Sequence, residues 1–75
     1  MASMIIKRDY STGEVAKRTL VQCASASDVS DLEEDETIAP GSVAYLDDLS
    51  KVYVMDEDGK FNEASANAIL LAVTF

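Results

Sequence analysis

The sequence predicts a mainly β fold: a small antiparallel meander with hairpins, and one short helix between residues 25 and 35. Short runs of β-branched and aromatic residues are separated by turns that contain glycine or aspartate, which is typical of consecutive strands. One acidic segment, SASDVSDLEEDE (25–36), has instead the serines and spaced apolar residues of a helix. A chain of 75 residues has room for one domain, which we place at residues 4–64.

The first hairpin is predicted from two strand-forming runs on either side of a turn. The runs are MIIKRDY (4–10) and VAKRTLVQC (15–23), and the segment between them, STGE, contains Gly13. Residues 1–3, MAS, precede an internal methionine. We interpret them as a vector-derived extension, with the natural start at Met4.

The short helix has candidate N-caps at Ser27 and Ser30. The segment SDLE (30–33) has the spacing of a capping box, in which a hydroxyl and a carboxylate satisfy free backbone N–H groups. The acidic residues that follow repel one another and favour a frayed end. APG (39–41) then breaks the chain, and Gly41 is predicted to lie in a turn.

Three further strands are predicted as a meander, at SVAYL (42–46), KVYVM (51–55) and KFNEA (60–64). The segments DDLS and DEDG supply its turns, with Asp58 and Gly59 in the second, because glycine adopts a positive φ at little cost. Calcium binding is the alternative for this acidic turn. An EF-hand loop with Gly59 in sixth place needs ligands at its first and twelfth positions, which here are Val54 and Ser65. The ligand count therefore favours a turn.

The composition argues against catalysis, metal binding and nucleic-acid binding. The chain has no histidine to activate its single cysteine, Cys23, so we expect no enzyme, no metal site and no cofactor. Cys23 is expected to be a small buried apolar residue. Six basic and 14 acidic residues give a net charge of −8, which argues against binding to nucleic acids or anionic membranes. There is also no apolar run of about 18 residues that would predict a transmembrane helix.

The C-terminal segment ASANAILLAVTF (64–75) carries no charge. We interpret residues 65–75 as an apolar C-terminal strand or arm, which must be paired or buried to avoid aggregation. Burial inside the domain and burial against a neighbouring subunit are both open, and the small core favours the neighbour. The predicted subunit interface consists of Ile69, Leu70, Leu71, Val73 and Phe75.

The order of MIIKRDYSTGE, RTLVQCAS, an acidic helix and PGSVAYLDDLSKVYVMDEDGKF resembles small structural proteins of phages and prophages of Gram-positive bacteria, of the head-fibre, capsid-decoration and head–tail type. The resemblance covers residues 4–63. In that pattern the aromatic residue after DG-x lies close to the C-terminus, whereas here SANAILLAVTF follows it.

This resemblance implies a non-enzymatic virion protein made in the bacterial cytoplasm. It also implies a homo-oligomer, with a trimer favoured, bound to the capsid or to another virion protein. The basic residues near the N-terminus would then contact an acidic partner surface: Lys7, Arg8, Lys17 and Arg18. The alternative is a small soluble module that recognises a sugar or a peptide through exposed strand aromatics such as Tyr45.

Overall fold

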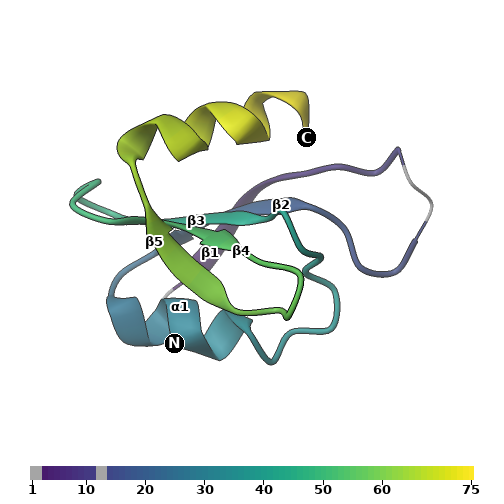
Figure 1. The fold of residues 1–75 in the computed structure, drawn as a ribbon, viewed down its shortest axis with the longest axis horizontal. Coiled ribbons are helices and arrows are strands. Elements are labelled where there is room, and N and C mark those ends of the chain that lie inside the picture. The colour runs from purple at the N-terminus through teal and green to yellow at the C-terminus, as the bar shows by residue number, and fades with distance from the viewer. Residues whose placement is uncertain (1–2, 12–13) are drawn as a thin grey trace.

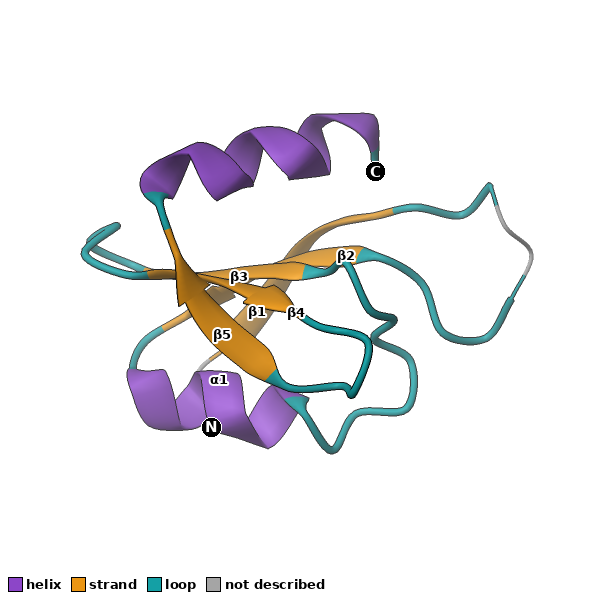
Figure 2. Ribbon diagram, viewed as in Figure 1, coloured by secondary structure: helices purple, strands orange, loops and turns teal. Residues whose placement is uncertain are grey.

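The computed structural model describes residues 3–11 and 14–75, which form one five-stranded sheet with a helix on each face (Figures 1 and 2). The predicted mainly β fold is confirmed. The predicted turn residue Gly13 and the first two residues of the MAS segment lie outside the described residues. The strands, which lie in the sheet in chain order, are β1 (Ser3–Arg8), β2 (Thr19–Cys23), β3 (Val43–Leu46), β4 (Val52–Met55) and β5 (Phe61–Ala64).

Both predicted antiparallel units are present, and they are joined by one parallel pairing. β1 and β2 form the hairpin, and β3, β4 and β5 form the meander. β2 and β3 run parallel, with Leu20 opposite Val43. The reason is the crossover through helix α1 (Ala26–Leu32), which returns the chain to the starting end of β2 before β3 begins. The sheet is therefore mixed.

Helix α1 lies within the predicted range of residues 25–35, but it begins earlier than its predicted caps. Its N-cap is Ser25, so the prediction of Ser27 or Ser30 is wrong. Asp28 is the reason, because its carboxylate reaches back and accepts a hydrogen bond from the Ser25 backbone N–H at 3.2 Å. The segment SASD (25–28) thus forms the capping box that we assigned to SDLE (30–33).

Strand alternation divides the apolar side chains between two cores. On β2, Val21 and Cys23 face α1, whereas Leu20 points to the opposite face. The core under α1 consists of Val21, Cys23, Val29, Leu32, Ile38, Ala44 and Met55. The core on the other face consists of Leu20, Val43, Val52 and Ala72. Figure 2 shows the two helices on opposite sides of the sheet.

The C-terminal segment, predicted as a strand or an arm over residues 65–75, is a helix, so the strand alternative is wrong. The 3₁₀-helix η1 (Ala66–Thr74) packs over β3 and β4. Ile69, Ala72 and Phe75 recur every third residue, the period of this helix, and all three contact the second core. The segment failed as a strand because its apolar residues are continuous, and a continuous run does not distinguish helix from strand.

The second core is thus closed by the chain's own tail. The accessible surface is 4497 Å², and a folded monomer of 8.1 kDa is expected to expose about 4500 Å². The area that the chain leaves exposed is therefore that of an average folded monomer of this size.

Candidate functional site

The structure separates the predicted interface residues into two groups. Ile69 and Phe75 are half-buried and pack against the second core. The other three side chains face solvent: Leu70 is 68 % exposed, Val73 65 % and Leu71 56 %. We call Leu70, Leu71 and Val73 the η1 surface. Large apolar residues clustered on one short helix and open to water are typical of a contact surface.

Strand β1 carries a second exposed apolar group that the sequence did not reveal. Met4 is 59 % exposed, Ile5 51 % and Ile6 44 %. We call these three residues and the unpaired side of the strand the β1 edge. The sequence signal was present as three successive apolar residues without polar alternation, but a buried strand has the same pattern.

A β-bulge sets which way the β1 side chains point. Ile5 lies opposite Val21 and Lys7 opposite Leu20, so Ile6 is the extra residue. The bulge places Lys7 on the face that η1 covers. There its ammonium Nζ donates a hydrogen bond of 2.8 Å to the backbone carbonyl of Val73. This bond joins β1 to η1.

The opposite edge of the sheet, at β5, carries polar and charged groups. The Phe61 backbone N–H donates a 2.7 Å hydrogen bond to the Glu33 carboxylate, which extends from the end of α1. Lys60 lies 3.9 Å from the same carboxylate. The exposed β5 residues are Asn62 and Glu63, and Glu63 forms a 2.6 Å ion pair with Lys51. Charged and capped edges of this kind resist pairing with another strand.

The last residue of the chain is held by a cation. The Arg18 guanidinium lies over the Phe75 ring at 5.1 Å and forms a 2.6 Å ion pair with Asp9. The Ser11 hydroxyl and then the Arg18 guanidinium hold the pKa of the Asp9 carboxyl well below its usual range. The C-terminal end of η1 is thereby linked to the β1–β2 connection.

The four basic residues near the N-terminus all bond within the chain. Besides the bonds of Lys7 and Arg18, Arg8 donates to the hydroxyls of Thr19 and Thr37. Lys17 donates to the Glu14 carbonyl and lies near the Tyr10 ring. The prediction that these cations contact an acidic partner stays a prediction.

The acidic glycine segment is a turn, as predicted. Gly59 has φ +80°, and the Asp56 carboxylate accepts hydrogen bonds from the backbone N–H groups of Asp58 and Lys60 at 2.9 and 3.0 Å. The Asn62 amide donates to its other oxygen at 2.7 Å. These bonds satisfy Asp56 within the chain and lower its pKa. In the described part of the chain, no three acidic, histidine or cysteine side chains are grouped so as to hold a metal ion.

The other predicted turn glycine, Gly41, also has a positive φ, of +91°. The turn between β3 and β4 needs the same backbone conformation but supplies it with Leu49, at φ +61°. A leucine rarely adopts this conformation, because its Cβ then crowds the following carbonyl oxygen. The DDLS segment gave no sign of this strain.

Cys23 is fully buried, as predicted. Burial, and then the negative charges of Asp28 and Asp47, raise the pKa of its thiol to about 11. The thiol is therefore protonated near neutral pH. A protonated, inaccessible thiol is a poor nucleophile and supports no covalent chemistry.

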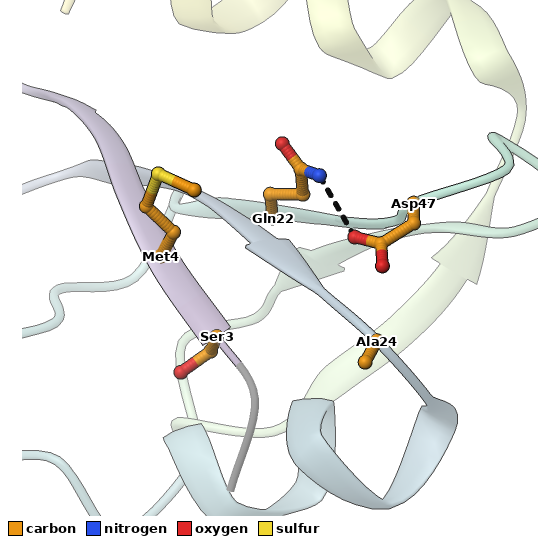
Figure 3. A pocket seen from close by; sticks show the side chains of 5 residues that line it. All are labelled: Ser3, Met4, Gln22, Ala24 and Asp47. Atoms are coloured by element: carbon orange, nitrogen blue, oxygen red, sulfur yellow. Dashed lines mark hydrogen bonds between the residues drawn. The ribbon is translucent and has the colours of Figure 1, made fainter.

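One shallow depression of about 240 Å³ lies beside β1 (Figure 3). It is lined by Ser3, Met4, Gln22, Ala24 and Asp47. The Gln22 amide donates to Asp47 at 2.8 Å and accepts from the Tyr45 hydroxyl at 3.2 Å. Because Gln22 and Asp47 already bond to each other, they have less capacity to bind a small ligand.

The strand aromatics are largely used for packing. Tyr45 packs against the η1-side core, and Tyr53 and Phe61 pack against the α1-side core. Tyr10, which follows β1, is the aromatic residue that is mostly exposed in the part of the chain that the structure describes.

Comparison with protein-family models, with curated proteins and with solved structures gave no match. No described helix has the length and apolar character needed to span a membrane. The candidate functional site consists of the two exposed apolar surfaces described above, the η1 surface and the β1 edge.

Proposed function

We propose that this protein is a non-enzymatic structural subunit that acts by assembling with other chains, as a capsid-associated component of a phage or prophage virion. The observation that carries the proposal is the η1 surface. Leu70, Leu71 and Val73 remain exposed although the same helix buries Ala72. A helix that needs only to cover the sheet would gain solubility from polar residues at those three positions.

The virion context comes from the sequence resemblance. The meander that carries it, residues 42–64, supplies strands β3, β4 and β5. The extension that distinguishes this chain from that pattern forms η1 and its exposed surface. The part that departs from the pattern is thus also the part that offers a contact surface.

Sugar or peptide recognition through strand aromatics receives less support. Tyr45, Tyr53 and Phe61 contribute to the two cores, and the Tyr45 hydroxyl already bonds to Gln22. An aromatic residue that packs and bonds inside its own domain has little surface left for a ligand.

Sedimentation velocity over a range of protein concentrations tests assembly. We expect the wild-type protein to form an oligomer, and the double variant Leu70→Ser/Leu71→Ser to shift towards monomer. Leu49→Ser is the matched control, because Leu49 is an equally exposed leucine in a turn of the sheet. If all three proteins are monomers at every concentration, assembly through the η1 surface is refuted. A capsid gene adjacent to the gene for this protein would support the virion context, and its absence would count against that context.

A further inference from the structure

We propose that the β1 edge pairs with the β1 edge of a second copy of this chain. The two strands would run antiparallel about a two-fold axis perpendicular to the sheet, so that the sheet continues through the dimer. The inference rests on the proposed role in assembly. It names a second contact surface and identifies its partner.

The first argument is that β1 is an open edge. Its six residues form the longest strand of the sheet, and β1 pairs with β2 on one side only. A strand paired on one side presents N–H and C=O groups that a further strand can bond. At the other edge of the sheet, Glu33 accepts the Phe61 N–H and the exposed residues Asn62 and Glu63 are polar, whereas Met4, Ile5 and Ile6 leave β1 apolar and exposed.

The second argument is that β1 complements itself. Its sequence, SMIIKR, has a polar end, an apolar centre and a basic end. Parallel pairing would place both basic ends together, which is destabilising between neighbouring strands. Antiparallel pairing places the basic end of each strand beside the polar end of the other and brings the two apolar centres together.

In one register of this pairing, the bulge places the cross-strand neighbours of the two copies on the same face of the sheet. With the axis between Ile5 and Ile6, Met4 of one copy lies opposite Lys7 of the other. Met4 pairs with Gln22 and Lys7 with Leu20 within the chain, so both side chains point to the η1 face. A two-fold axis perpendicular to the sheet keeps the η1 faces of both copies on the same side. Cross-strand neighbours therefore share a face, as antiparallel pairing requires.

The third argument is electrostatic. Two chains of net charge −8 repel each other over most of their surface. The β1 strand has two cations and no acidic residue. The polar end of the strand borders the depression that contains Asp47. The proposed pairing brings the cationic end of one strand towards that carboxylate on the other copy. The β1 edge is thus a place where two such chains can meet with little repulsion.

A partner of strongly acidic character fits the β1 edge less well than a second copy. Lys7 bonds to the Val73 carbonyl, and Arg8 bonds to Thr19 and Thr37. Both cations thus have bonding partners within the chain, whereas the open backbone edge and the exposed side chains of Met4, Ile5 and Ile6 are available for contact. A second copy supplies both in matching order.

One six-residue strand pair is smaller than a standard interface of about 800 Å² per partner, so we expect weak pairing, with a dissociation constant on the order of 100 µM. Sedimentation equilibrium from roughly 10 to 1000 µM therefore covers the range needed. We expect Ile6→Lys to weaken dimerisation at least tenfold, because it places two additional cations at the centre of the interface. Leu49→Lys is the matched control, and we expect it to dimerise like the wild type.

Disulfide trapping tests the register. In a Met4→Cys/Lys7→Cys variant, each new thiol would face the other thiol type across the two-fold axis, at a Cα separation of about 5 Å that a disulfide can span. We expect covalent dimers at protein concentrations where a Leu49→Cys variant, which reports random collisions, remains monomeric. Cys23 is buried and protonated in both variants and does not compete.

The outcomes separate this inference from the proposed function. An oligomer that Ile6→Lys weakens, with efficient trapping, supports the β1 pairing. An oligomer that is lost in Leu70→Ser/Leu71→Ser but unchanged in Ile6→Lys overturns the pairing and leaves the proposed function standing. Trapping no faster than that of Leu49→Cys overturns the register. A purely trimeric assembly overturns the two-fold axis, and a monomer throughout refutes both proposals.

Discussion

The position most informative about the tail is Ala72, where a buried charge should detach η1 from the sheet. Ala72 is 2 % exposed and lies in the core with Leu20, Val43 and Val52. Leu20, Val43 and Val52 are apolar and offer no charged partner to the carboxylate introduced by Ala72→Asp. It would have to stay ionised without water, take up a proton, or force η1 away from the sheet.

The cost can be estimated from the proton-uptake route. Protonating a carboxyl group of ordinary pKa near 3.9 at pH 7 costs about 1.36 kcal/mol for each of about three pH units, or about 4 kcal/mol. If η1 instead detaches from the sheet, the loss of stability cannot exceed the free energy that packing of η1 on the sheet contributes. We therefore expect Ala72→Asp to lower the free energy of unfolding by up to about 4 kcal/mol, measured by urea denaturation at pH 7.

Two controls isolate the charge. Ala72→Asn has nearly the same shape without the charge, and Val73→Asp places the same charge on the exposed side of η1, where surface substitutions change stability by about 0.5 kcal/mol or less. The pH dependence gives a further check. A buried carboxyl has a raised pKa in the folded state, so its penalty is greatest at high pH and is lost as the pH falls towards the unfolded value.

Between pH 7 and pH 5 the stability difference between Ala72→Asp and Ala72→Asn should therefore shrink by up to about 2.7 kcal/mol. Equal stabilities for Ala72→Asp and Val73→Asp at pH 7 would refute the packing of η1 on its own sheet. That result would instead support the alternative in which residues 65–75 form an arm that binds another subunit.

Three further substitutions test single features of the fold. Leu49→Gly should raise the free energy of unfolding by about 0.5–1 kcal/mol, because glycine removes the strain of a positive φ at an exposed site; a lower midpoint in urea would contradict this. Glu33→Ala should lower the free energy of unfolding by about 1 kcal/mol, because the Phe61 N–H loses its acceptor. Glu33→Gln keeps an acceptor oxygen and should retain most of the stability that Glu33→Ala loses. Asp9→Asn should lower the melting temperature at pH 7. Because the pKa of Asp9 is depressed in the folded state, its contribution is complete above the unfolded value near 4 and is lost as the pH falls below it. A melting difference that widens on acidification would show that the ion pair with Arg18 is not its source.

The elements that could be predicted are those specified by neighbouring residues. The meander follows from local turn signals, since Gly59 and the Asp56 side chain fix a tight turn between two strand-forming runs. The parallel pairing of β2 with β3 depends on where α1 lies, and α1 packs through contacts distant in sequence. The helix lies in its predicted range, but its N-cap was placed too late, because SASD and SDLE both have the capping spacing and only burial of Asp28 favours the first.

The candidate site was predicted in part for a similar reason. The run AILLAVTF contains no charged residue to mark its solvent side, so the sequence could not separate Ile69 and Phe75, which pack inward, from Leu70, Leu71 and Val73. Once the segment is a helix with a three-residue period, that separation follows directly. The β1 edge was missed because exposure of Met4, Ile5 and Ile6 depends on how the other elements pack: among residues 3–11 and 14–75, no further strand pairs with β1 and no helix buries these side chains. The sequence of β1 does not indicate how these other elements pack.

The exposed apolar groups and the large net charge have opposite effects on association of this protein. The apolar groups on β1 and η1 favour association, whereas a net charge of −8 on every copy opposes it. Salt screens the repulsion between copies over about 10 Å and leaves apolar contacts in place. Association through these surfaces should therefore strengthen as salt is added, the opposite of the behaviour of an interface held by attraction between opposite charges. The acidic surface would then keep free subunits apart until they are concentrated, as they would be at a shared partner surface.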